Sequence, residues 1–375
     1  MKILLIGDFS NYHRALSDGL RQLGHDVTVA SSGTQWLNTE RDVDLRRRGG
    51  KLGGALLYAR LNSTLLPRLS GYDVVQICSP LFVELRPARV SRVFDMLKCR
   101  NGHLFLTALS TDSHLVERLS GPNPPLRYSE WQVEGCPTPF ALSDVNMRRE
   151  WLAPEMVEHD RHIYANVDGT VTALYEYHKI IEDAFSADRL AYAGIPIDLQ
   201  KIQPAAMLGL GQADPVRIMV AYPKARMVEK GADRLVAMAR ELERRHPGRI
   251  IVDEVTQLPY SQFVERIKQS HIIVDQLYSY TPGTTALLAM AMGRVTVSGG
   301  EEEYYDFIGE RSLRPIINTD PADIGETMRR VEAVALDRER LMAMAAEGPE
   351  FVRRHNDSVE VARRFQRFWE KRINS

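Results

Sequence analysis

The chain has 375 residues, of which 44% are hydrophobic and 26% charged, and its formal net charge is −1. These values are typical of a soluble protein with room for two domains, and they argue against a basic nucleic-acid-binding arm. No run approaches the roughly 18 apolar residues that a transmembrane helix needs. Three cysteines without metal-like spacing indicate a reducing compartment, so we expect a cytoplasmic protein.

Short apolar runs alternate with amphipathic stretches along residues 1–198, the pattern of a parallel sheet covered by helices on both faces. Four apolar residues from Tyr12 to Leu23 recur at helical spacing and predict a helix after the first strand. Residues 121–140 carry five prolines and predict a long irregular loop. Strands are expected over residues 2–7, 26–31, 72–79, 103–110 and 169–174.

A second alternating unit covers residues 199–355, and its expected strands are 216–222, 249–255, 271–277 and 294–299. The last segment, 356–375, has one apolar stripe and predicts a closing helix. That stripe consists of Val361, Ala362, Phe365, Phe368 and Trp369. We therefore expect an α/β chain of two Rossmann-like domains, 1–198 and 199–355, followed by a C-terminal helix.

Residues 275–293, DQLYSYTPGTTALLAMAMG, predict a strand end, a turn and a helix rich in small residues. Backbone amides at such a turn open onto a helix N-terminus, which favours phosphate binding. Gly283 lets the backbone approach a ligand, and the hydroxyls of Thr284 and Thr285 can bond phosphate oxygens. The alternative is structural: Thr281 or Thr284 only caps the helix.

Several segments, in this order, resemble the GT-B glycosyltransferases, especially the retaining family-4 type. They are YAGIPIDLQKIQP (192–204), KARMVEKGADRLVAMA (224–239), LLAMAMGRVTVSGG (287–300) and FVRRHNDSVEVARRF (351–365). The resemblance implies two Rossmann-like domains facing a cleft, with the last helix returning toward the N-terminal domain. It also implies that the N-terminal domain binds the acceptor and the C-terminal domain a nucleotide sugar.

The basic residues Lys224, Arg226 and Lys230 resemble the cations that hold the donor diphosphate in this family. Fixed cations suit that role because they stabilise charge as it develops on a leaving group. The spacing departs from the family pattern, since Ala225 stands where an arginine is usual, and Arg226 or Lys224 is the candidate substitute. The alternative interpretation is a solvated basic loop.

Two glutamates that the family uses to contact the donor sugar and the ribose are absent, because Tyr280 and Leu288 occupy their positions. Leucine cannot accept hydrogen bonds from ribose hydroxyls. The lost ribose contact must then come from elsewhere, if it is made, and the candidates are Glu254, Asp275 and Gln276. Glu301, in an acidic run after the next strand, is a candidate for the donor-sugar contact, with a solvated face as the alternative.

In the first domain, Asn11 lies in the turn after the first strand and is either a substrate contact or a helix cap. Asp112 and His114 follow a later strand, where related enzymes keep polar groups near the transferred sugar. These two are the predicted catalytic residues, although a surface histidine is commoner than a catalytic one. The basic run 46–51 either contacts anionic lipid or a charged acceptor, or forms a mobile basic loop.

The resemblance implies a hexosyltransferase-type enzyme that moves a sugar from a nucleotide-sugar donor to a glycan, lipid-linked or small-molecule acceptor. It implies retention of configuration, no metal and no cofactor beyond the donor, and a cytoplasmic location with peripheral membrane contact. No nucleic-acid partner is expected. Two alternatives remain: a nucleotide-sugar epimerase, and a catalytically silent GT-B protein that binds a nucleotide sugar or pairs with an active transferase.

Overall fold

The computed structural model describes residues 1–33, 39–143, 145–202 and 214–375. The chain forms two compact units. Unit 1 comprises Met1–Gly121, Val145–Pro196 and Ser358–Ser375, and unit 2 comprises Pro122–Asp144 and Ile197–Asp357. The borders near residues 197 and 358 lie close to those expected from the sequence, whereas segment 122–144 differs, because it packs with unit 2.

Unit 1 is built on a seven-stranded, all-parallel sheet. Its central strands are short apolar runs buried on both faces, as expected where helices cover the whole sheet. In spatial order the strands are β3 (Val43–Asp44), β2 (Asp26–Ser31), β1 (Lys2–Ile6), β4 (Val74–Ile77), β5 (His103–Ala108), β8 (Gly169–Thr172) and β9 (Leu190–Tyr192).

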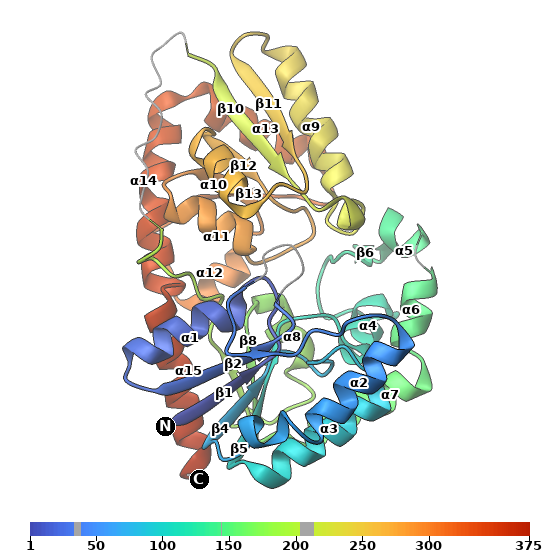
Figure 1. The fold of residues 1–375 in the computed structure, drawn as a ribbon. Coiled ribbons are helices and arrows are strands. Elements are labelled where there is room, and N and C mark those ends of the chain that lie inside the picture. The colour runs from blue at the N-terminus through green and yellow to red at the C-terminus, as the bar shows by residue number, and fades with distance from the viewer. Residues whose placement is uncertain (34–38, 144, 203–213) are drawn as a thin grey trace. The chain divides into compact units, whose positions relative to one another are not determined.

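Helices cover both faces of this sheet, with α1 (Tyr12–Gln22) and α15 (Ser358–Ile373) side by side on one face (Figure 1). α3 (Pro87–Arg100) and α7 (Pro154–Asn166) pack together on the other. The remaining helices of unit 1 are α2 (Lys51–Leu61), the 3₁₀ turn Leu66–Leu69, α4 (Ser113–Ser120), α6 (Val145–Trp151) and α8 (Tyr175–Ile181).

The predicted C-terminal helix is confirmed as α15, and it returns to unit 1 as expected. All five residues of its apolar stripe are buried. Phe368 contacts Phe105 edge-on at a centroid distance of 5.8 Å, and the indole Nε1 of Trp369 donates to Gln76 Oε1 at 2.9 Å. The last residues of the chain therefore complete the core of the first unit.

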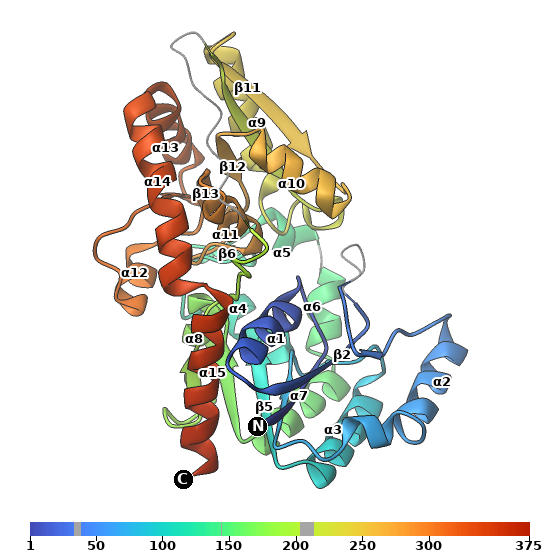
Figure 2. The same cartoon turned by 60° about the vertical axis from the view of Figure 1, so that its left-hand side comes forward.

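Unit 2 has a five-stranded parallel sheet in the order β11-β10-β12-β13-β14. These strands are β11 (Ile250–Val255), β10 (Val216–Ala221), β12 (Ile272–Val274), β13 (Val295–Ser298) and β14 (Ile316–Asn318). Its helices are α9 (Ala232–Arg245), α10 (Tyr260–Lys268), α11 (Thr284–Ala291), α12 (Glu302–Ile308), α13 (Ile324–Leu336) and α14 (Arg338–His355). Figure 2 shows α13 and α14 side by side.

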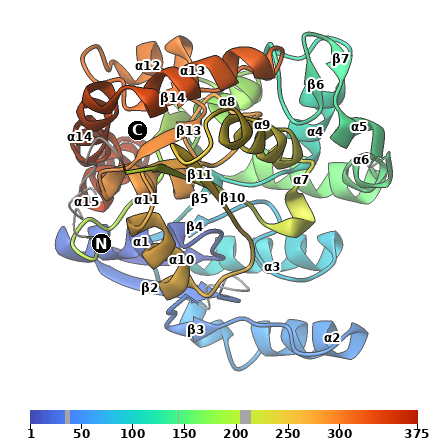
Figure 3. The same ribbon diagram turned by 90° about the horizontal axis from the view of Figure 1, so that it is seen from above.

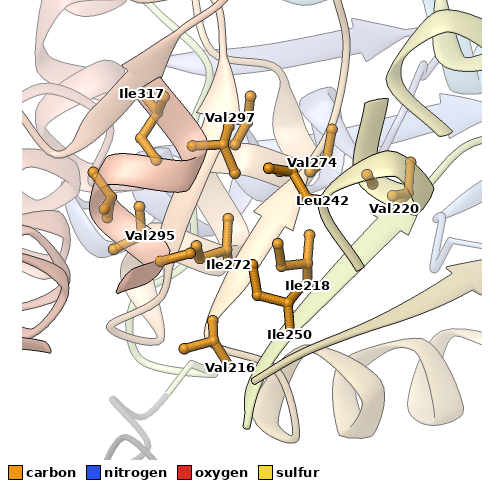
Figure 4. Packing of buried hydrophobic residues seen from close by; sticks show 14 of the residues in the cluster. Val216, Ile218, Val220, Leu242, Ile250, Ile272, Val274, Val295, Val297 and Ile317 are labelled. Carbon is orange, nitrogen blue, oxygen red and sulfur yellow. The ribbon is translucent and has the colours of Figure 1, made fainter. Parts of the chain in front are cut away.

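Alternating side chains of this sheet enter two separate apolar clusters, as the two-residue period of a strand requires. Val216, Ile218 and Val220 of β10 point to the face covered by α9 and α13, and Figure 4 shows them gathered with Ile250, Ile272 and Val295. Met219 and Ala221 point to the opposite face, where α10 and α11 lie (Figure 3).

The proline-rich segment was expected to be irregular throughout, and that prediction is partly wrong. Residues 122–143, here called the clasp, contain a two-stranded antiparallel hairpin of β6 (Gln132–Val133) and β7 (Cys136–Pro137), followed by α5 (Pro139–Ser143). The amide of Ser129 donates to Gln132 O at 2.7 Å, and Trp131 packs on Phe140. Local hydrogen bonds and one aromatic pair thus give regular structure to a stretch for which the prolines predicted an irregular loop.

Within the described ranges, no helix is long and apolar enough to cross a membrane.

Candidate functional site

The chain reverses its direction of strand addition between β10 and β12 of unit 2. From β10 it first adds β11 on one side and then β12 on the other. In open α/β sheets a crevice for ligands forms at such a switch point, beyond the carboxyl ends of the strands. Asp275 directly follows β12, and Lys230 precedes the helix that follows β10.

Lys230 and Asp275 form an ion pair at this switch point. Lys230 Nζ lies 3.3 Å from Asp275 Oδ1, and the two side chains are 18% and 1% exposed. The amide of Leu277 donates to the carbonyl of Lys230 at 2.9 Å, which ties the loop after β10 to the end of β12. One predicted cation is therefore fixed at the place where the fold would present a ligand.

Gly231, the residue after Lys230, has a positive φ of 64° and precedes the first turn of α9. A Cβ there would lie 2.7 Å from Leu277 Cβ. Only glycine meets both demands without strain. Lys230 and Gly231 thus lie where the loop after β10 closely approaches the loop after β12.

The N-terminus of α11 lies beside the same carboxylate. Gly283 is its N-cap residue, and no side chain there accepts a capping hydrogen bond. A Cβ on Gly283 would lie 2.6 Å from Asp275 Oδ2 and 3.3 Å from Gln276 Nε2. Thr284 and Thr285 are half-exposed in the first turn. Because the N-cap residue is a glycine, no threonine hydroxyl occupies the N-cap position, and the first amides of α11 belong to the kind of helix N-terminus that can bind an anion.

The other two predicted cations lie on the 3₁₀ turn Lys224–Arg226 after β10. Arg226 Nε donates to Glu229 Oε2 at 2.9 Å, so its guanidinium is paired locally. Lys224 is exposed, and no ion pair joins it to another residue in the described part of the chain. The structure therefore brings Lys230 to the switch point and leaves Lys224 and Arg226 on an exposed turn.

Tyr280 and Leu288, which stand where the GT-B glycosyltransferases of family 4 have two glutamates, are both buried and packed against other side chains. Leu288 lies in the apolar cluster with Ile267 and Ile273. Tyr280 is buried and stacks on Tyr128 of the clasp, with ring centroids 4.4 Å apart and planes 19° from parallel. Burial raises the pKa of Tyr280 to about 12. Neither position offers a carboxylate, and Tyr280 instead anchors the clasp.

Glu301 is the centre of a hydrogen-bond cluster that fastens the clasp. Its Oε1 accepts from the hydroxyl of Tyr128 at 2.7 Å and from Asn318 Nδ2 at 3.0 Å, and its Oε2 accepts from Arg127 at 2.8 Å. Burial raises the pKa of Glu301, but the hydrogen bonds from Asn318, Tyr128 and Arg127 outweigh it, so the net shift is downward. Sequence reasoning missed Arg127 and Tyr128, because nothing local pairs them with a residue about 170 positions away.

Replacing Glu301 with glutamine should lower the free energy of unfolding at pH 7 by about 1–2 kcal/mol, because charge-assisted hydrogen bonds become neutral ones. A carboxylate with a lowered folded-state pKa stabilises the fold above its usual pKa of 4.5 and loses that contribution as the pH falls below it. The variant should therefore lose less stability than the wild type between pH 7 and pH 3, as measured by urea unfolding.

Glu303→Gln is the matched control, since within the described residues the ion pair of Glu303 is with the exposed Arg127, at 3.2 Å. It should change stability by no more than about 0.5 kcal/mol. Equal effects of the two variants at pH 7 would contradict the central place of Glu301 in the cluster.

The remaining candidates of unit 2, Glu254 and Gln276, differ in whether other side chains already engage their polar atoms. Glu254 Oε1 accepts from Arg240 at 2.8 Å, and its Oε2 lies 3.4 Å from the hydroxyl of Tyr222. Gln276 is half-exposed beside Gly283. Glu254 is thus engaged at the edge strand, whereas Gln276 lies at the switch point with Lys230.

In unit 1, Asn11 occupies the N-cap position of α1 but makes no side-chain capping bond, and its φ is 66°. The nearby Asp8 accepts instead, from the amide of His13 at 2.9 Å and the hydroxyl of Thr39 at 3.0 Å. Burial raises the pKa of Asp8 to about 6. Asn11 is therefore not the side-chain cap that the structural alternative required, and its substrate contact stays a prediction.

Asp112 is the N-cap of α4, and both of its carboxylate oxygens have partners. Oδ1 accepts from the amide of Leu115 at 2.8 Å and Oδ2 from the hydroxyl of Tyr164 at 2.7 Å. Burial raises its pKa to about 7. His114 Nε2 lies 3.3 Å from Asp183 Oδ1. These contacts account for both residues structurally, and the catalytic roles stay predictions.

The basic run 46–51 leads into α2. Arg46 pairs with Asp44 at 2.9 Å, and Arg47 donates to the carbonyl of Gly50 at 2.8 Å. Leu52 and Leu56 of α2 are 87% and 61% exposed. This surface combines cationic and apolar side chains within unit 1.

No protein-family model and no curated protein sequence matches the chain. Its fold matches solved structures over nearly the whole length. Sucrose-phosphate synthase from Thermosynechococcus elongatus aligns at a TM-score of 0.63 with 12% identity, covering 99% of both chains. Anabaena HepE in complex with UDP and glucose gives 0.60 and 12% over 98% of both, and an alpha-glucosyltransferase in complex with UDP gives 0.56 and 12% over 100% of this chain and 99% of that one. The expected two-domain GT-B fold is confirmed.

Proposed function

We propose that the chain is a glycosyltransferase that moves a sugar from a nucleotide-sugar donor to a glycan, lipid-linked or small-molecule acceptor. One observation carries this function: the Lys230 ammonium and an N-terminus of α11 without a side-chain cap converge on Asp275 at the switch point of unit 2. Structures of the same fold were solved with UDP, which supports a nucleoside diphosphate as the leaving group.

The chemistry follows from that arrangement. Cleavage of the sugar–phosphate bond leaves negative charge on the diphosphate, and a fixed ammonium with helix amides stabilises such charge as it develops. Such groups take over the charge neutralisation that a metal would otherwise supply, so the proposed reaction needs no metal. The proposed reaction also retains the configuration of the sugar, because the leaving phosphate can assist attack on the same face without a protein nucleophile.

Turnover separates this enzyme from a silent nucleotide-sugar-binding protein. The full chain, incubated with UDP-glucose, GDP-mannose and ADP-glucose in separate reactions, should slowly hydrolyse one of them. Proton NMR of fresh product should show the anomer of the donor, as retention requires. Tight binding with no hydrolysis or transfer would contradict the proposed activity and favour the silent-binder alternative.

We also propose a cytoplasmic location with peripheral contact to a membrane. The exposed Leu52 and Leu56, next to Arg47, Arg48 and Lys51, support peripheral contact of α2 with an anionic membrane surface. The unpaired cysteines Cys78, Cys99 and Cys136 agree with a cytoplasmic enzyme. Co-sedimentation with phosphatidylglycerol vesicles, and its loss in high salt, tests the membrane contact.

A further inference from the structure

The two oxygens of the Asp275 carboxylate have different surroundings. Oδ1 lies 3.3 Å from Lys230 Nζ. Oδ2 is buried and has no hydrogen-bond partner among the residues that the structure describes. The side chain as a whole is almost completely buried beside the N-cap of α11. Within the described residues, one oxygen of the Asp275 carboxylate therefore has a partner and the other has none.

A buried acceptor without a partner is costly, and such groups are rare in folded proteins. An ionised carboxylate only accepts hydrogen bonds, so the missing partner must be a donor. A phosphate oxygen is itself an acceptor and would be repelled. A hydroxyl group is the donor that a nucleotide sugar offers in greatest number, on its ribose and on its sugar.

The structure also distinguishes Asp275 from the other two candidates for the lost ribose contact. The Glu254 carboxylate is engaged by Arg240, and the Gln276 side chain carries no charge. Asp275 alone of the three combines a negative charge, an oxygen without a partner and a place at the switch point beside Lys230.

We propose that Asp275 is a ligand-binding residue of the donor site, whose Oδ2 accepts a hydrogen bond from a hydroxyl group of the bound nucleotide sugar while Oδ1 holds Lys230 beside the diphosphate. The inference rests on the proposed donor site and adds its hydroxyl-reading residue. It makes Asp275 a determinant of specificity in place of the carboxylate that Leu288 cannot supply.

The test combines a protein variant with a ligand variant. Binding of UDP, CDP, GDP and ADP to the wild type is measured by calorimetry, and the tightest is compared with its 2′-deoxy and 3′-deoxy forms. If a ribose hydroxyl meets Asp275, one deoxy form should bind about 10- to 100-fold more weakly to the wild type, the range expected for a charge-assisted hydrogen bond. Asp275→Asn should bind the ribonucleotide more weakly and lose most of that discrimination.

If a hydroxyl of the sugar is the partner instead, Asp275→Asn should keep its affinity for the diphosphate and lose the added affinity of the matching nucleotide sugar. Unchanged or tighter binding of both ligands would overturn the inference, because removing a charge that only repels the diphosphate strengthens binding. Failure of all four diphosphates to bind the wild type would contradict the proposed donor site itself.

Asp253→Asn is the matched control, since Asp253 lies on β11 in an ion pair with Arg266 at 3.1 Å. It makes the same chemical change away from the switch point and should leave nucleotide affinity unaltered. The deoxy ligands probe the wild-type protein directly, so they test the hydroxyl contact even if Asp275→Asn folds poorly.

Discussion

Lys230→Ala is expected to abolish nucleoside diphosphate binding. The Lys230 ammonium is the only one of the three predicted cations that the structure brings to the switch point of unit 2, where it pairs with Asp275. Hydrogen bonds to charged groups contribute about 1.5–3 kcal/mol each, so the loss of one of them weakens binding by about 10- to 100-fold and the loss of two weakens it further. Calorimetry with the tightest-binding diphosphate measures this loss.

The same substitution also removes the partner of a buried carboxylate. Breaking a buried ion pair from one side typically costs about 3–5 kcal/mol, because the remaining charge stays buried and uncompensated. Lys230→Ala should therefore lower the free energy of unfolding as well as the affinity, and the two effects must be separated.

The double variant Lys230→Ala/Asp275→Asn separates them. Without the Asp275 charge, most of the lost stability should return, whereas binding should stay absent. Recovery of nucleotide affinity along with stability would show that Lys230 only neutralises Asp275 and does not hold the diphosphate.

Gly231→Ala is expected to lower the free energy of unfolding by about 2–5 kcal/mol and to weaken nucleotide binding. The left-handed backbone costs a side-chain-bearing residue about 1–2 kcal/mol. The new Cβ would also lie 2.7 Å from Leu277 Cβ, and relieving such an overlap typically costs about 1–3 kcal/mol. Because the adjacent Lys230 carbonyl is bonded to Leu277, the shift should carry Lys230 away from Asp275.

Gly248→Ala is the matched control, since Gly248 also has a positive φ but has open space where a Cβ would stand. It should show the backbone strain alone, with unchanged nucleotide affinity. Chemical unfolding measures the difference between the two variants, and equal destabilisation would contradict the close approach of the two loops.

Much of the fold could be predicted because local patterns determine it. Apolar runs such as residues 2–6 form the buried strands, and the stripe from Val361 to Trp369 forms the closing helix. That segment 122–144 belongs to unit 2 could not be predicted, because the contacts that join it to that unit are with residues far along the chain. The stack of Tyr128 on Tyr280 joins two tyrosines about 150 positions apart, and no periodicity records such a pair.

Those residues of the candidate site were predictable whose type alone indicates a role, such as a lysine for charge or a glycine for an unusual backbone. Lys230, Gly231 and Gly283 could be singled out because a basic residue and glycines before a predicted helix are visible in the sequence, and the structure gives them an ion pair, a positive φ and the N-cap position of α11. That Asp275 Oδ2 has no partner among the described residues was not predictable, because it depends on which groups the fold brings to each oxygen. Asp112 is a similar case with the opposite outcome: its oxygen Oδ2 has a partner, Tyr164, and the sequence does not show that contact either.

Calorimetric titration of the full chain with UDP, CDP, GDP and ADP tests the central claim most directly, that the switch point of unit 2 binds a nucleoside diphosphate. The structure predicts saturable binding of at least one of them, lost in Lys230→Ala/Asp275→Asn while that variant remains folded. No binding of any diphosphate to the folded wild type, or equal binding to the double variant, would contradict it.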